Sequence, residues 1–240
     1  MTERYSRPES TPPTARRVAC RALVMTALSY RGKVELDTTW REREKEVQRI
    51  QGFVRDLGME SEAEPGERDL LGRELGRLTQ REAVNMSWLI EGVGVLAWGL
   101  GRYTLPPHDE GVEPRDLADS LAFLTPTARD VLARATLVSK DEVSLYREIA
   151  FAVHWRMVEW RLRPTACDLM ALAGRLPWMD EEAIRRLPLV DGDLSIHGRP
   201  IAACSEVDRN RCASIAIERH RAAIWLLGEE KVFSEIVPNT

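Results

Sequence analysis

The sequence predicts an all-α protein, a single-domain multi-helix bundle with one small β-hairpin near residues 193–202. Three observations carry this prediction. Over most of the 240 residues, apolar side chains recur at intervals of three and four, two Ser/Thr-x-x-Glu capping boxes begin at Thr79 and Ser139, and glycine or proline follows the long helical stretches. Residues 191–202 differ, because two short apolar runs there flank a His197-Gly198 turn.

In the first half of the chain, helices are expected over 15–30, 40–57, 66–77 and 80–100, with a short extended piece at 33–37. Thr14 is the expected cap of the first helix. The second helix ends at Gly58 and has one apolar stripe, formed by Val47, Ile50, Phe53, Val54 and Leu57. The fourth begins at the capping box of Thr79 and Glu82 and ends at Gly101.

In the second half, helices are expected over 115–123, 127–137, 140–163, 180–187 and 205–227, with a short tail helix after Gly228. Pro164 ends the longest of them. No internal repeat and no linker divides the chain, so residues 14–240 are expected to form a single helical domain. Residues 1–13 are polar and Pro-rich, which predicts a disordered N-terminal tail in place of a signal peptide.

The composition is that of a soluble globular protein, with 44% hydrophobic and 30% charged residues. A net charge of −4 gives no drive toward nucleic acid. The four cysteines, at 20, 167, 204 and 212, form no C-x-x-C pair, so we expect free thiols, a cytoplasmic location, no metal and no cofactor.

Residues 83–100 form an apolar stretch at the lower limit of length for a membrane span. Three glycines, Asn85, Ser87 and a central Glu91 argue against insertion and favour a buried core helix. Glu91 is the only ionisable side chain from Asn85 to Gly101. A carboxylate in such a helix must have a partner, bind a ligand or take up a proton.

Several blocks of residues together resemble a known family. They are Ser87-Trp88-Leu-Ile-Glu91-Gly-Val-Gly-Val-Leu96-Ala97-Trp98-Gly-Leu100-Gly101, Tyr146-Arg147, His154-Trp155-Arg156, Asp191-Gly-Asp193-Leu and Ser214-Ile-Ala-Ile-Glu218-Arg219-His220-Arg-Ala-Ala-Ile-Trp225-Leu-Leu-Gly228. This set is similar to a widespread bacterial family, domain-of-unknown-function family four-two-seven-two, from about residue 16 to the C-terminus. The most specific block is Glu218-Arg219-His220. The resemblance implies a fold and a set of site residues, and no activity.

Two interpretations of these polar residues are open. In the first they form a buried ion-pair network, with Glu91 bound to Arg147 or Arg219 and with His154 and His220 donating to carbonyls or carboxylates. In the second they line a small-molecule pocket, whose aromatic walls and polar end are formed by Trp88, Trp98, Trp155, Trp225, Glu91, Arg147, His154 and Glu218. Glu218 and His220 lie two apart on one helix and cannot readily bind the same metal ion.

The first interpretation predicts an interaction or binding module with a buried polar core. Its partner is an unknown protein or small molecule, with neither nucleic acid nor membrane involved, and a homodimer is left open. One alternative is an enzyme in which Glu91 is the base, His154 the acid and Arg219 the group that holds an anion. Another is a partner-neutralising protein of the immunity type, with which the acidic net charge is consistent.

Overall fold

The computed structural model describes residues 11–240. The α-helices of this part are α1 (Ala15–Leu36), α2 (Arg43–Asp56), α3 (Pro65–Gly72), α4 (Gln80–Gly99), α5 (Pro114–Ser120), α6 (Ala128–Ala133), α7 (Lys140–Leu162), α8 (Leu169–Ala173), α9 (Glu181–Arg185) and α10 (Glu206–Leu226). Three short strands, β1 (Leu189–Val190), β2 (Asp193–Ile196) and β3 (Arg199–Pro200), and two 3-10 helices, η1 (Ile201–Ala203) and η2 (Phe233–Glu235), complete it. The predicted helical fold with one small sheet is confirmed.

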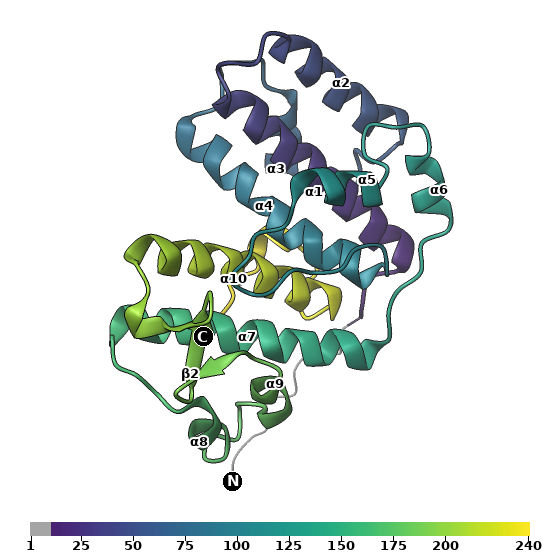
Figure 1. Cartoon of the computed structure of the whole chain (residues 1–240). Coiled ribbons are helices and arrows are strands. Elements are labelled where there is room, and N and C mark those ends of the chain that lie inside the picture. The colour runs from purple at the N-terminus through teal and green to yellow at the C-terminus, as the bar shows by residue number, and fades with distance from the viewer. Residues whose placement is uncertain (1–10) are drawn as a thin grey trace.

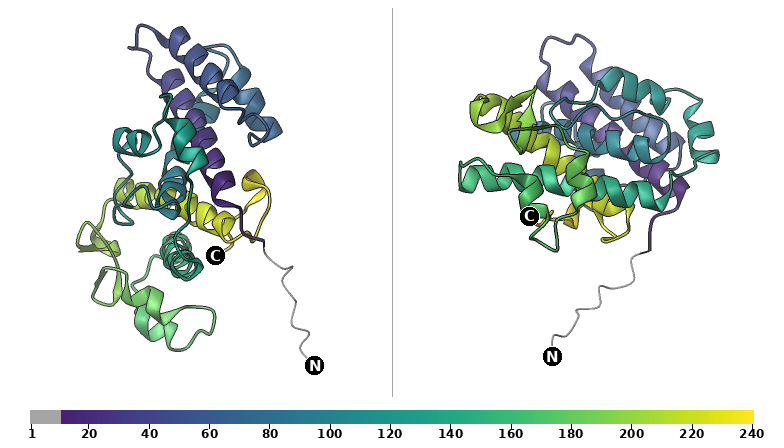
Figure 2. Two further views of the ribbon diagram at one scale, coloured as in Figure 1. Left: turned by 90° about the vertical axis from the view of Figure 1, so that its right-hand side faces the viewer. Right: turned by 60° about the horizontal axis from the view of Figure 1, so that its bottom comes forward.

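Four long helices form the frame of the molecule. The most extensive contact between two helices joins α1 to α4, and α10 packs on both α4 and α7 (Figure 1). Seen from the side, α10 lies between the layer that contains α1 and α4 and the layer that contains α7 (Figure 2). Helix α9 packs on α7, α8 packs on α9, and β2 contacts α10.

The molecule has two hydrophobic cores, and α10 contributes to both. The first core lies around α1 and α4 and takes in Ala222–Leu226 of α10, whereas the second lies around α7, α8, α9 and β2 and takes in Cys212 and Ala216. Between these two parts of α10 stand Glu218, Arg219 and His220, all of them buried. A layer of buried polar groups therefore separates the two cores.

The helix ends follow the local signals in the sequence. The hydroxyl of Thr79 accepts from Glu82 N at 3.2 Å, and that of Ser139 accepts from Glu142 N at 3.2 Å, so both capping boxes are confirmed. Gly101 and Gly228 have φ of 67° and 70° and follow the ends of α4 and α10, as expected.

The expected extended piece at 33–37 is wrong, because α1 continues to Leu36. Gly32 lies in its interior at the closest approach of α1 to α4. A Cβ on Gly32 would stand 2.6 Å from the Ala83 carbonyl oxygen and 2.8 Å from the Met86 Cβ. The glycine is therefore required by helix packing, and it does not end the helix. Gly92, Gly94 and Gly99 of α4 also lie against protein side chains, those of Met25, Val112 and Leu226.

The predicted hairpin exists as β2 and β3, which pair antiparallel with Ser195 opposite Pro200. Two details differ from the prediction. A further strand, β1, pairs with β2, and residues 201–203 form η1 instead of continuing the hairpin. Helix α8 was also not predicted, because its five residues are too few to show a periodic pattern.

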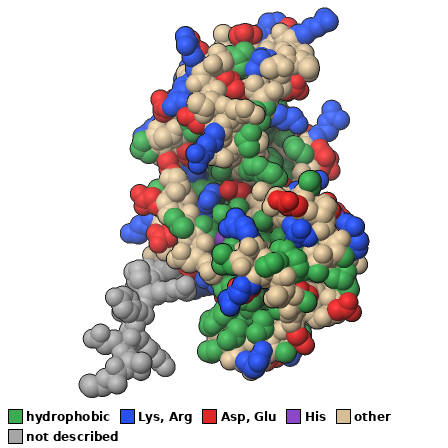
Figure 3. Space-filling view, turned by 90° about the vertical axis from the view of Figure 1, so that its left-hand side faces the viewer, with side chains coloured by type: hydrophobic (Ala, Val, Ile, Leu, Met, Phe, Trp, Pro, Cys, Tyr) green, Lys and Arg blue, Asp and Glu red, His purple; other side chains and the backbone are tan. Residues whose placement is uncertain are grey.

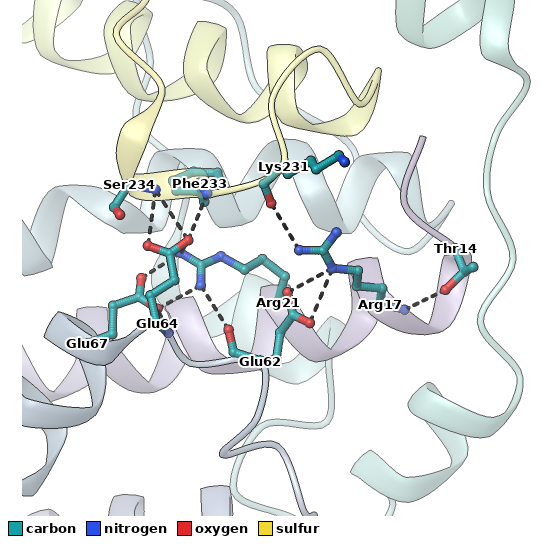
Figure 4. Close-up of polar contacts among 9 residues, drawn as sticks. All are labelled: Thr14, Arg17, Arg21, Glu62, Glu64, Glu67, Lys231, Phe233 and Ser234. Atoms are coloured by element: carbon teal, nitrogen blue, oxygen red, sulfur yellow. Dashed lines mark hydrogen bonds and ion pairs between the residues drawn. The ribbon is translucent and has the colours of Figure 1, made fainter. Parts of the chain in front are cut away.

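Ion pairs join α1 to α3, and hydrogen bonds fasten the C-terminal segment to both helices (Figure 4). Arg21 is 1% exposed and donates to both carboxylate oxygens of Glu67, at 2.7 and 2.5 Å. Glu64 accepts from the backbone N–H groups of Phe233 and Ser234, at 2.7 and 3.2 Å. Of the expected N-terminal tail, residues 1–10 lie outside the described residues, and Pro13 is buried.

Candidate functional site

Glu91 forms a buried ion pair with Arg219. Its Oε2 lies 2.9 Å from Nη2 and 3.1 Å from Nε of Arg219, and its Oε1 accepts from Val112 N at 3.0 Å. Arg219 also donates to the carbonyl oxygens of Pro106, Pro107 and Glu110. The pair thus joins α4, α10 and the loop that follows α4. The prediction that Glu91 pairs with an arginine is confirmed for Arg219.

Arg147, the other expected partner of Glu91, lies elsewhere. It donates to Glu148 at 2.9 Å, is 3.4 Å from Glu229, and its guanidinium stands 5.6 Å from the Phe151 ring centroid. The expected pairing of Arg147 with Glu91 is therefore wrong. Arg147 lies on α7 and Arg219 on α10, and only the packing of α10 decides which of the two arginines reaches Glu91.

A second buried pair, Arg156 with Asp193, was not predicted. The guanidinium donates to both carboxylate oxygens at 2.6 Å, and the two side chains are 0% and 3% exposed. Residues 191–193 include a turn, with positive φ at Asp191 and Gly192, and Asp193 is buried and holds β2 against α7. Arg156 and Asp193 both lie in the sequence blocks that resemble the family. The blocks therefore contained both residues, but nothing in them indicated that the two residues pair.

His154 and His220 hydrogen-bond to each other between α7 and α10. Their Nδ1 atoms are 3.1 Å apart, and both rings are buried. The expectation that they donate to carbonyls or carboxylates is wrong. Desolvation, then the nearby Arg161 and Arg221, lower the pKa of His154 to about 4. Desolvation, then His154 and Arg147, lower the pKa of His220 to about 3. Both rings are therefore neutral at pH 7.

The neutral state fixes the protons of this pair relative to one another. One Nδ1 must carry the proton and donate, and the other must be bare and accept. A neutral ring holds one N–H proton, so the ring that donates through Nδ1 has a bare Nε2, and the ring that accepts has a protonated Nε2. Among the described residues neither Nε2 has a hydrogen-bond partner, and that of His220 is buried.

Glu218 belongs to the layer of buried polar groups between the two cores, and it forms an ion pair within its own helix. Its carboxylate accepts from Arg221 Nη1 at 2.9 and 3.0 Å, and burial raises its pKa. Of the tryptophans of the expected pocket, only Trp88 lines a described cavity together with Glu218, and the Glu218 carboxylate is bound by Arg221 there.

The four tryptophans of the expected pocket stand in four different environments. Trp98 stacks on Tyr146, Trp155 meets Trp178 edge to face, and Trp225 packs against Phe233. Trp88 lines a separate cavity of about 470 Å³, together with Glu218 and Arg221. The structure therefore does not bring them together with Glu91 around one pocket.

One cavity opens where α7 ends and α10 begins, and we call it the first cavity. Its volume is about 530 Å³, and His154, Trp160, Arg161, Arg209, Asn210 and Ser214 are among the residues that line it. Figure 3 views the side of the molecule at which α7 ends and α10 begins; hydrophobic side chains and several Lys or Arg side chains lie exposed on this side. Apart from His154, none of these lining residues was predicted, because they are surface residues of two helix ends that carry no motif.

A second cavity lies on the other side of the histidine pair, against the C-terminal segment. Its volume is about 710 Å³, and Lys140, Arg147, Phe151, Trp178, His220 and Glu230 are among its lining residues. His154 lines only the first cavity and His220 only the second. The hydrogen-bonded pair is therefore the wall between them.

The loop after α4 contributes two further polar groups that sequence reasoning missed, half-buried His108 and buried Asp109. His108 donates through Nε2 to the Ser195 carbonyl at 2.8 Å, and Asp109 accepts from His197 N at 2.6 Å. These contacts fasten the loop to the β2–β3 hairpin. Only the Pro-rich composition of the loop was visible in the sequence, and it did not predict a histidine bonded to the hairpin.

The cysteines are free thiols. Burial raises the pKa of Cys212 to about 12 and that of Cys167 to about 11, so neither thiol ionises at neutral pH. Within residues 11–240, no three His, Cys, Asp or Glu side chains are placed to hold a metal ion. None of the helices in that part is long and apolar enough to cross a membrane.

Comparison with known proteins adds one result. The model of the family described as Domain of unknown function (DUF4272) matches residues 3–171, and no curated protein and no solved structure matches the chain. The match includes α4 and α7 and ends before the block Glu218-Arg219-His220 on α10. Since it covers well over half of the 240 residues, the chain belongs to the DUF4272 family.

Proposed function

We propose that the protein is a ligand-binding module and that the first cavity binds a small organic anion with a flat apolar part. The observation that carries this proposal is the side chain of His154. It is 5% exposed, it lines the cavity, and its Nε2 has no partner among the described residues. Unlike the buried Nε2 of His220, that of His154 is accessible to solvent, so a ligand in the cavity can hydrogen-bond to it.

The charges around the cavity favour an anion. Arg161 and Arg209 line it together with a single acidic residue, Glu206. Arg161 has no ion-pair partner among the described residues, and Arg209 uses Nη1 for the carbonyls of Ile201 and Cys204, which leaves Nε and Nη2 to bind. Guanidinium groups bind carboxylates and phosphates through two parallel hydrogen bonds.

The other walls favour a flat apolar group. Two guanidinium groups lie over the Trp160 ring, those of Arg156 and Arg209, at 5.2 and 5.6 Å from its centroid. Met157, Val158, Pro164 and Ile217 complete the lining. A volume of about 530 Å³ is within the range of small-molecule sites.

Calorimetric titration with benzoate, and with the matched neutral compound benzamide, tests this proposal. We expect benzoate to bind and benzamide to bind more weakly, because only benzoate carries the charge. Arg161→Gln should weaken benzoate binding on the order of tenfold, the effect of losing one charged hydrogen bond. Arg163→Gln is the control, since Arg163 pairs with Glu159 and does not line the cavity. Equal binding of benzoate to wild type and Arg161→Gln, or equal affinity for benzamide, would contradict the proposal.

The geometry gives less support to the alternative that the protein is an enzyme with Glu91 as base and His154 as acid. Both carboxylate oxygens of Glu91 accept hydrogen bonds from Arg219 or Val112, and the acid proposed beside it, His154, bonds to His220. Glu91 also lines none of the cavities described above. A partner-neutralising role stays a prediction, and a stoichiometric protein partner in the purified material would support it.

A further inference from the structure

We propose that the second cavity binds an organic ammonium ion and that the His154–His220 pair transmits its occupancy to the first cavity as a change of tautomer. The part that concerns the anion rests on the proposed function of the first cavity. The ammonium site and the tautomer change stand on their own observations. These are the bond between the rings, the orphan nitrogen of His220 and the residues around it.

The pair acts as a relay because its two inner nitrogens share one proton. The Nδ1 atoms are 3.1 Å apart, so the rings can hold only one proton between them while this bond exists. If His220 Nε2 is bare, its Nδ1 carries the proton and donates to His154, and the proton of His154 is then on Nε2. If His220 Nε2 is protonated, every assignment is reversed, and His154 Nε2 is bare.

The residues of the second cavity select a cation. Lys140 and Arg147 line it against Glu148, Glu229 and Glu230, which gives a net charge of −1. Arg147 is already held by Glu148 and Glu229. Glu230 is exposed, and no ion pair joins it to another described residue. An ammonium group that enters here meets an acidic side chain without a competing arginine.

Aromatic rings add to this preference. Phe151 lies edge to face with both Trp178 and His220, with ring centroids 5.9 and 5.7 Å apart. The faces of aromatic rings attract organic cations. The Nε2 of His220 is buried in this group of rings without a partner among the described residues. It can accept a hydrogen bond from an ammonium N–H only if it is bare.

The hydrogen bonds that the two ligands need determine whether each ligand strengthens or weakens the binding of the other. An ammonium ion in the second cavity holds His220 Nε2 bare, and the relay then places a proton on His154 Nε2. A protonated His154 Nε2 is a donor, which is what a carboxylate in the first cavity requires. Each ligand therefore favours the tautomer that the other ligand needs, and by linkage each must tighten the binding of the other.

The test uses the full-length protein with ¹⁵N-labelled histidine and benzylammonium alone. Two-bond ¹H–¹⁵N spectra distinguish a protonated ring nitrogen from a bare one. We expect saturation with benzylammonium to leave His220 Nε2 bare and to protonate His154 Nε2, with His108 and His197 unchanged. Benzyl alcohol, which has the same ring and no charge, should bind more weakly.

A second titration measures the coupling. Benzoate should raise the affinity for benzylammonium about fivefold or more, within the usual range of allosteric coupling. His154→Phe should abolish that increase, because phenylalanine removes the ring nitrogen through which the two cavities are coupled. If the variant fails to fold, the tautomers of the wild-type protein still decide the question.

Three results would overturn the proposal: no binding of benzylammonium, a complex with His220 Nε2 protonated, or an unchanged His154 upon binding. If benzylammonium sets the tautomers as expected while benzoate does not bind, the relay and the ammonium site are supported and the proposed function of the first cavity fails. The two failures are therefore distinguishable.

Discussion

Arg219 Nη2 lies 2.9 Å from Glu91 Oε2, across the boundary between the two hydrophobic cores. The residues are 128 positions apart in the sequence. Because Arg219 also donates to three carbonyl oxygens of the loop after α4, this one side chain determines where α4, α10 and the loop stand relative to one another. Similar buried bridges join α1 to α3 and α7 to β2.

Glu91→Leu should destabilise the fold by about 3–5 kcal/mol, because it leaves the Arg219 guanidinium buried without a counter-ion. Urea unfolding followed by circular dichroism measures this loss. The control is Glu181→Leu, which removes an exposed carboxylate paired with Arg185 and should change the free energy of unfolding by less than about 1 kcal/mol. A loss for Glu91→Leu as small as that of the control would show that the buried pair does not hold the cores together.

Gly32 and Gly52 offer a matched pair of helix-interior glycines. Gly52→Ala should stabilise the protein by about 0.5–1 kcal/mol, since a Cβ there has only the Arg55 guanidinium nearby and alanine is the better helix former. Gly32→Ala should destabilise it by about 1–3 kcal/mol, because the new Cβ would overlap the backbone of α4. Thermal unfolding of the two variants should give melting temperatures on opposite sides of the wild-type value. Stabilisation by Gly32→Ala would contradict the close packing of α1 on α4.

The histidine pair should make stability depend on pH. In the folded protein the pKa values are lowered to about 4 for His154 and about 3 for His220, whereas unfolded histidine titrates near 6.5. Between these values the unfolded chain binds more protons, so the contribution of the pair is fully present above about pH 6.5 and falls as the pH is lowered toward 4. Each histidine contributes a slope of up to about 1.4 kcal/mol per pH unit.

Urea unfolding of wild type and His154→Gln between pH 4.5 and 7.5 checks this dependence. The variant keeps a hydrogen-bonding group beside His220 and removes one titrating ring, so its slope should be shallower. The raised pKa of Glu218 is common to both proteins and cancels in the comparison. Parallel curves would mean that His154 is protonated equally in the folded and unfolded chains.

Local features of the fold were predictable from the sequence, and long-range ones were not. The caps at Thr79 and Ser139 and the glycines that end α4 and α10 act within a few residues, so their spacing predicts them. The end of the first helix was misjudged, because Gly32 is required by a contact with another helix and does not end its own. A composition rule applied within one segment cannot show such a contact.

In the candidate site, too, a local feature was predictable from the sequence and the contacts between helices were not. The isolation of Glu91 in an apolar helix correctly predicted a buried partner, and the choice of Arg219 over Arg147 required the packing of α10. The pairing of His154 with His220 joins residues 66 positions apart on two helices, and it followed from no motif. Trp160, Arg161 and Arg209 become candidate site residues only because they line the cavity between two helix ends, and no sequence motif marks them.

An NMR titration of uniformly ¹⁵N-labelled protein with benzoate, read at the backbone amides and the histidine ring nitrogens, tests the anion site most directly. We expect saturable amide shifts that cluster around the first cavity, at Met157, Trp160, Arg161 and Ser214, together with protonation of His154 Nε2. Saturable shifts elsewhere with none at these residues, or no shift at millimolar benzoate, would contradict the assignment of this cavity as an anion-binding site.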